Sequence, residues 1–144
     1  MKKITTLFTF FIALSMGFSQ DKVMYADLDV LLDKVDKLEA DEKYENILEE
    51  LDKVHENDSA YCSVLTSKSY YLLNMERFDD AIKVADEGLN RSCGESNLYF
   101  FINKGVALLN KEKYKEAIEV YNEGLKTYPK NYKLRRTNRS ARNV

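Results

Sequence analysis

The side chains that most often carry catalysis are sparse in this sequence. His55 is the only histidine, so no Ser-His or Cys-His set can be assembled without it. It stands beside Glu56, in what we predict to be the second helix of a helix pair, and a solvated surface histidine is the simplest interpretation. The five glycines are scattered and form no phosphate-binding loop. We therefore predict no catalytic residue, no metal site, no cofactor and no enzymatic activity.

The most informative feature is instead a stretch of sequence that occurs twice. FDDAIKVADEGLNRSCGE, residues 78–95, returns 36 residues later as YKEAIEVYNEGLKTYPKN, residues 114–131. A fainter copy lies further back, where Tyr44 stands one repeat before Phe78. A sequence that repeats with a period of about 34 residues is typical of a solenoid, in which similar units stack on one another.

Each repeated unit reads as two helices joined by a turn. In the last copy, apolar residues recur at three- and four-residue spacing from Leu98 to Leu109, and again from Tyr114 to Tyr128. Pro129 then ends the second helix, because proline cannot continue a helix from within. We expect the small residues Gly105 and Ala117 to let the two helices approach closely. Such a hairpin cannot bury both of its faces alone, so it stacks on the next copy.

The pattern resembles the tetratricopeptide repeat family. The third unit fits best, and its matching positions are Phe101, Gly105, Tyr114, Ala117, Tyr121 and Pro129. The second unit carries Cys93 in place of the proline, and the first has Val35 and Ile47 where small residues belong. The resemblance implies an all-α fold, an α-solenoid of about three helix-turn-helix units with a short basic C-terminal segment. The predicted array covers residues 20–131, with units at about 28–61, 62–95 and 98–131.

The only two cysteines lie at the two ends of the second unit. Cys62 opens its first helix and Cys93 follows its second, and these ends lie side by side in an antiparallel hairpin. Disulfides form in proteins that are exported, and the N-terminal residues described below predict export for this chain, so a disulfide between the two cysteines is expected. The alternative is a pair of buried, reduced thiols, because the sequence does not set the distance between the two Cα atoms.

The resemblance also implies a binding surface, since related arrays present the first helix of each pair on a concave face. The residues at the corresponding positions are Asp29, Asp33, Asp36, Ser67, Tyr70, Asn74, Tyr99, Asn103 and Asn110. This groove lacks the lysines and arginines with which related co-chaperone modules grip a terminal carboxylate, so a basic or neutral segment of a protein is expected. The three aspartates have an alternative interpretation as the solvated face of an end helix.

The first nineteen residues differ in character from the rest. Lys2 and Lys3 precede the uncharged apolar run ITTLFTFFIALSMGF, and Gly17 and Ser19 supply small residues before a cleavage site. This order predicts a secretory signal peptide, residues 1–19, cleaved to leave Gln20 first. The apolar run is too short to span a bilayer, which needs about 20 residues. We expect an exported protein, periplasmic or secreted, with no transmembrane span and no nucleic-acid partner.

The C-terminal segment, residues 132–144, is basic and poorly suited to cap an array. As a helix it offers little apolar cover, namely Tyr132, Leu134, Ala141 and Val144. A loose capping helix, a disordered tail and a segment bound by an anionic partner are all compatible with it. The leading functional hypothesis is a non-catalytic protein-binding module. The alternative is a structural subunit that self-associates, or joins a larger envelope complex, through its repeat ends and this tail.

Overall fold

A computed structural model describes residues 28–143, and this part of the chain is built from helices without a strand. The α-helices are α1 (Leu28–Ala40), α2 (Tyr44–Leu51), α3 (Tyr61–Asn74), α4 (Phe78–Asn90), α5 (Asn97–Asn110), α6 (Tyr114–Thr127) and α7 (Tyr132–Arg142), with a 3-10 turn η1 (Gly94–Ser96) before α5. The predicted all-α solenoid is therefore confirmed. None of these helices is long and apolar enough to cross a membrane. The predicted signal peptide lies outside the described residues.

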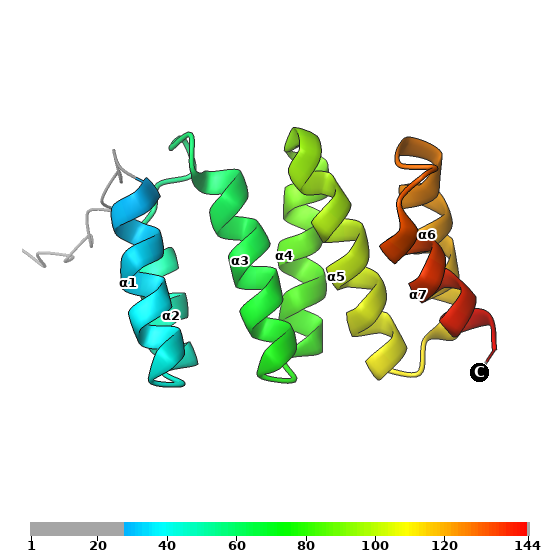
Figure 1. The fold of residues 1–144 in the computed structure, drawn as a ribbon, viewed down its shortest axis with the longest axis horizontal. Helices are drawn as coiled ribbons and strands as arrows, with labels where there is room; N and C mark the ends of the chain where they lie inside the picture. Colours follow the sequence, from blue (N-terminus) through cyan, green and yellow to red (C-terminus); the bar gives the residue numbers. More distant parts are fainter. Residues whose placement is uncertain (1–27, 144) are drawn as a thin grey trace, which may run out of the picture.

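The helices stand side by side in chain order and form a row of pairs (Figure 1). The first helix of each pair lies on one side of the row, so that α1, α3, α5 and α7 share a face. Along this face α3 contacts α5, and α5 contacts α7, whereas no comparable contact joins α2 to α4 or α4 to α6. From α3 to α7 the row is thus tighter on the face of the odd-numbered helices, which places that face on the inner side of a curved array. Helices α1 and α3 make no comparable contact.

The turn inside each pair has the same backbone geometry in all three units. Glu42, Glu76 and Glu112 adopt left-handed φ angles of 55°, 58° and 58°. In each turn the next residue donates its backbone N–H to a carbonyl of the preceding helix, as Lys113 does to Leu108 at 2.9 Å. This arrangement is a Schellman-type helix end, where glycine is the usual residue. Its threefold recurrence shows that the three units are built alike, including the first, whose sequence departs most.

Close helix contacts depend on residues without bulk. A Cβ atom added to Gly105 on α5 would lie 2.2 Å from the Tyr121 ring on α6. One added to Gly88 on α4 would lie 2.2 Å from the Phe100 ring on α5. The first contact lies within the third unit and the second joins the second unit to the third. Small residues therefore set the spacing both inside a unit and between units.

The second helix of the first unit ends earlier than predicted. Helix α2 ends at Leu51, and residues 52–60 form a loop before α3. His55 therefore lies in this loop and not on a helix, which corrects the prediction. Its Nδ1 accepts a hydrogen bond from the backbone N–H of Asn57 at 3.1 Å. Further along the loop, Asp58 Oδ1 accepts from the N–H of Ala60 at 2.8 Å, and this turn leads the chain into α3.

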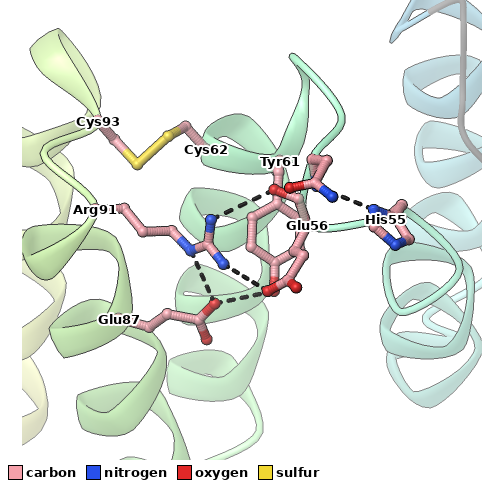
Figure 2. A network of polar contacts seen from close by, with 8 residues as sticks. His55, Glu56, Tyr61, Cys62, Glu87, Arg91 and Cys93 are labelled. Carbon is pink, nitrogen blue, oxygen red and sulfur yellow. Dashed lines mark hydrogen bonds and ion pairs between the residues drawn. A yellow bond between two sulfur atoms is a disulfide. The ribbon is translucent and has the colours of Figure 1, made fainter.

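A disulfide joins Cys62, near the start of α3, to Cys93, just after α4 (Figure 2). Their Cα atoms are 5.6 Å apart, so the bond ties together the open end of the second hairpin. Of the two interpretations left open by the sequence, the structure contains the bridged one. In the chain-entropy model, closing a loop of this length stabilises the fold by about 3.5–4 kcal/mol.

Arg91 lies beside this disulfide and fastens the 52–60 loop to α4 (Figure 2). Its Nη2 atom is 2.8 Å from the Glu56 carboxylate, and its Nε is 3.3 Å from that of Glu87. The guanidinium also stacks over the Tyr61 ring, 4.7 Å from its centroid. The Tyr61 hydroxyl donates to Glu87 at 2.9 Å, and burial together with this bond raises the pKa of Tyr61 to about 12. These contacts hold the loop of the first unit against the second unit.

The basic C-terminal segment forms the ordered helix α7, which packs against α6 and α5. The Asn131 side chain caps it by accepting from the Leu134 N–H at 3.0 Å. Leu134, Asn138 and Ala141 are buried, while Tyr132 is 75% exposed. The helix thus covers the end of the third unit with a narrower apolar stripe than the sequence suggested. Val144 lies outside the described residues.

Candidate partner-binding groove

The large apolar side chains that remain exposed in the described residues gather on one set of helices. They are Val30, Leu32, Tyr70, Tyr99 and Tyr132. All five belong to α1, α3, α5 or α7, and none to α2, α4 or α6. Of the five, Tyr70 and Tyr99 stand at predicted groove positions, whereas Val30 lies on the face of α1 that corresponds to the buried Val64 of α3. The inner face therefore exposes aromatic side chains that another molecule can cover.

The inner face contains a cavity of about 360 Å³ between α3 and α5. Its lining residues are Tyr70, Leu73, Asn74, Glu76, Phe78, Ile102, Asn103, Val106, Asn110 and Lys133. The apolar members come mainly from the two inner helices, and three asparagine amides are interspersed with them. Apolar walls with a few fixed polar groups are typical of recognition sites.

The predicted groove residues divide into two groups. Four of them line this cavity, namely Tyr70, Asn74, Asn103 and Asn110. The other five, Asp29, Asp33, Asp36, Ser67 and Tyr99, lie on the odd-numbered helices but are not part of its lining. The structure thus brings together the amide-rich half of the predicted site, while the aspartates occupy the neighbouring helix α1.

A hydrogen-bonded chain crosses from α3 to α5 beneath the cavity. The Asn103 Nδ2 donates to Ser69 Oγ at 2.7 Å, and the Ser69 hydroxyl donates to the Thr66 carbonyl at 2.8 Å. Ser69 is fully buried and Asn103 is only 8% exposed. Ser69 stands at the small-residue position that Gly105 occupies in the third unit, and it also orients the groove residue Asn103.

The side of the groove nearest α1 carries negative charge. The Tyr71 hydroxyl donates to Glu39 on α1 at 3.0 Å, and its ring meets that of Tyr70 edge-on with centroids 5.3 Å apart. Burial raises the pKa of Tyr71 well above its usual range, and Glu39 and Asp36 raise it further. One of the predicted aspartates, Asp33, is 2.6 Å from the Lys37 ammonium on the same helix. Acidic side chains of α1 thus border the tyrosine pair that leads into the cavity.

Leu73, Ile102 and Val106 also stand at groove positions of the repeat, whereas the other three lining residues were missed. Glu76 belongs to the turn after α3, Phe78 opens α4, and Lys133 comes from α7. Phe78 stands at the turn position of the repeat, as Tyr114 does one repeat later, and it packs partly against the core. No sequence signal pointed to Lys133, because its place at the cavity depends on the basic segment folding back as a helix.

The chemistry available at the groove is that of recognition. Amides and phenols can exchange hydrogen bonds with a polypeptide, and the apolar walls can cover a side chain. Across the described residues no group of three or more His, Cys, Asp and Glu side chains is arranged to hold a metal ion.

Comparison with known families supports this description. Residues 99–131 match the model of the tetratricopeptide repeat. The match covers the third unit, the one whose sequence fits the family pattern best, and supports a protein of the tetratricopeptide repeat type. No curated protein matches the chain.

Proposed function

We propose that this protein is a non-catalytic interaction module that holds a segment of another protein in the groove of its odd-numbered helices. The observation that carries the proposal is the distribution of exposed apolar side chains, which are confined to α1, α3, α5 and α7 in the described part of the chain. Tetratricopeptide repeats commonly serve as protein-interaction modules, and the matched unit supplies one wall of the cavity. The function rests on the groove together with this analogy.

The proposed partner segment is neutral or basic. Acidic side chains on α1 border the groove, and a free terminal carboxylate would be repelled there. The amides of Asn74 and Asn110 suit hydrogen bonds to the backbone of an extended chain, because each has donors and an acceptor. Asn110 uses one of its donors for the Val106 carbonyl, at 2.9 Å, and keeps the other donor and its oxygen. The apolar walls suit the side chains that alternate along such a segment.

The proposed place of action is outside the cytoplasm, periplasmic or secreted. The predicted signal peptide at residues 1–19 motivates this proposal, and the disulfide between Cys62 and Cys93 is consistent with an oxidising compartment. The partner is accordingly proposed to be another exported protein.

The test is site-specific photo-crosslinking in cells that produce the protein naturally. A photoreactive phenylalanine analogue replaces Tyr70 or Tyr99 on the inner face, and Lys115 on the exposed side of α6 as the matched control. We expect a discrete crosslinked partner from the two inner positions and none from Lys115. The identified partner is then purified and titrated against the Tyr70→Ala and Lys115→Ala variants.

Loss of an aromatic residue at the centre of an interface typically weakens binding by about tenfold or more. Tyr70→Ala should therefore reduce affinity by that factor, while Lys115→Ala leaves it unchanged. Equal crosslinking from Lys115, or equal affinity of the two variants, would place the contact elsewhere and overturn the proposal.

A further inference from the structure

We propose that the cavity between α3 and α5 receives a basic side chain, lysine or arginine, from the bound segment. This inference rests on the proposed function and adds the chemical class that the cavity selects. It follows from the orientation of one amide, that of Asn103, and from the charges around the cavity.

The first step concerns the single proton of the Ser69 hydroxyl. Ser69 Oγ donates that proton to the Thr66 carbonyl at 2.8 Å, one turn back on the same helix. A hydroxyl has one donor and two acceptor sites, so toward Asn103 the oxygen is able only to accept. Asn103 must therefore present its NH₂ group to Ser69, and the 2.7 Å contact is a donation from Nδ2. The flip of this amide is thereby determined by its partner.

The second step concerns the atom that remains. With Nδ2 committed to Ser69, the Oδ1 of Asn103 is left on the cavity side, and no described residue donates to it. The Asn97 oxygen is buried without a partner, whereas the Asn103 oxygen belongs to a residue that lines the cavity. The floor of the cavity is therefore a fixed hydrogen-bond acceptor in a side chain that is otherwise buried. Covering such an atom without supplying a donor is costly, so the occupant must bring an N–H or O–H group.

The third step distinguishes a cationic donor from a neutral one. Tyr70 lines the cavity, and its neighbour Tyr71 is bonded to Glu39, with Asp36 close enough to act on the same phenol. Among the lining residues Glu76 and Lys133 contribute one charge of each sign, so the lining itself is neutral on balance. The negative surplus comes from Glu39 and Asp36 of the bordering helix α1, and it favours a donor that carries positive charge.

The shape of the cavity suits the same kind of side chain. Leu73, Ile102 and Val106 form apolar walls above the acceptor. Lysine and arginine combine a methylene stem, which such walls can cover, with a charged head that donates hydrogen bonds. A glutamate would bring a second acceptor toward Oδ1 and a negative charge toward α1.

The experiment uses three blocked peptides of the form acetyl-Ala-Leu-X-Leu-Ala-amide, where X is lysine, norleucine or glutamate. Binding to the mature chain is followed by NMR through the side-chain amide of Asn103 and the methyl groups of Ile102 and Val106. A hydrogen bond to a charged group contributes about 1.5–3 kcal/mol, so the lysine peptide should bind about tenfold or more tightly than the norleucine peptide. The glutamate peptide should bind more weakly than either.

Two variants separate the orienting chain from the rest of the groove. Ser69→Ala removes the acceptor that fixes the amide, and should reduce the lysine preference severalfold while peptides still bind. Lys115→Ala, on the exposed side of α6 and away from the groove, is the control and should leave the preference unchanged. Asn103→Leu removes the acceptor itself and should bring the lysine and norleucine peptides to similar affinity.

Preferential binding of the glutamate peptide, equal binding of lysine and norleucine, or no shift of the cavity resonances at millimolar concentrations would each overturn the inference. These outcomes leave the proposed function intact if the crosslinks from Tyr70 and Tyr99 persist. Loss of those crosslinks would instead remove the proposed function, whatever the cavity prefers.

Discussion

At the scale of single residues, the array is held together by a contact that repeats from unit to unit. Lys68 on α3 is 2.5 Å from Asp52, just after α2, and Lys104 on α5 is 2.6 Å from Asp86 on α4. At the last junction Asn138 on α7 donates to Asn122 on α6 at 2.9 Å. The same place in three successive junctions is thus occupied by a polar pair, and the last pair is uncharged.

Lys34 shows what becomes of this contact at the beginning of the described array. It occupies the position in the first unit that Lys68 occupies in the second, but the described chain offers no earlier unit for it to reach. Its ammonium instead lies 2.7 Å from Glu50, which Lys53 also contacts at 2.5 Å. Burial raises the pKa of Glu50, but the hydrogen bonds and charges of the two lysines outweigh it, and the net effect is a lowered pKa.

The close contact at Gly105 leads to the first prediction. Alanine is a better helix former than glycine by about 1 kcal/mol, so Gly105→Ala would stabilise α5 if only helix propensity mattered. The added methyl group would, however, lie 2.2 Å from the buried Tyr121 ring, in a contact that neither rigid helix can relieve cheaply. We expect a net loss of about 1–3 kcal/mol in the free energy of unfolding, measured by urea titration with circular dichroism.

The control introduces Gly105→Ala into a chain in which Tyr121 is already replaced by the smaller leucine. Tyr121→Leu should itself be destabilising, but adding Gly105→Ala to it should cost less than in the original chain, because the ring is gone. Additive effects of the two substitutions would show that the contact with Tyr121 is not the cause.

At the scale of elements, α7 has the side-chain order of the first helix of a fourth unit. Its buried residues Leu134 and Asn138 occupy the repeat positions of Phe100 and Lys104 on α5 and likewise face the preceding unit. The face that would meet a second helix carries arginines in place of apolar residues, namely Arg135, Arg139 and Arg142, and all three are exposed. A helix that is apolar on one side and charged on the other closes an array, because it offers nothing further to stack on.

Leu134 should therefore account for much of the stability that α7 provides. It is fully buried, and a Cβ on Gly124 of α6 would lie 3.2 Å from its Cδ1. We expect Leu134→Ala to lower the free energy of unfolding by about 2–4 kcal/mol, measured by urea titration. Arg139→Ala, on the charged face of the same helix, should change it by less than about 0.5 kcal/mol. Similar losses for both variants would argue against α7 as a packed cap.

The same elements show how far sequence alone reaches. The 36-residue spacing was enough to predict the helix pairs of the second and third units, because periodic apolar residues must face one another in a stacked array. The early end of α2 at Leu51 was not predicted, since Val54 continues the apolar pattern into the loop, where it is also buried. Helix α7 was underestimated because a terminal helix needs only one apolar stripe, and counting apolar residues along the segment does not reveal that.

The groove was predictable to a similar extent. Tyr70, Asn74, Asn103 and Asn110 were identified from repeat positions, because the inner face of a solenoid recurs with the repeat. Whether one of these amides turns its donor or its acceptor toward the cavity depends on the side chain it meets on the neighbouring helix. The sequence does not show which side chains meet in this way. Lys133 reaches the cavity only through the packing of α7.

At the scale of the whole molecule, the two ends of the array differ from its middle in the same way. On α1 the face corresponding to the buried Val64 and Tyr71 of α3 carries Val30, Lys34 and Lys37. The two lysine side chains are 51% and 74% exposed and are paired with carboxylates on their own unit. At the other end the outward face of α7 is lined by arginines. Within residues 28–143, neither end of the array offers the continuous apolar surface by which the internal units stack.

This arrangement predicts that the chain from Gln20 onward is a monomer. Stacking the two ends of different copies would bring the lysines of α1 against the arginines of α7 and strip water from ion pairs, which costs more than the single exposed Val30 returns. Light scattering on size-exclusion eluate should therefore give the mass of one chain over a wide concentration range. Lys37→Leu places a second large apolar side chain two turns from Val30, and should make association detectable at high concentration. A stable dimer of the unaltered chain that dissociates when residues 132–144 are removed would instead favour the self-associating structural subunit, with its basic segment as the contact.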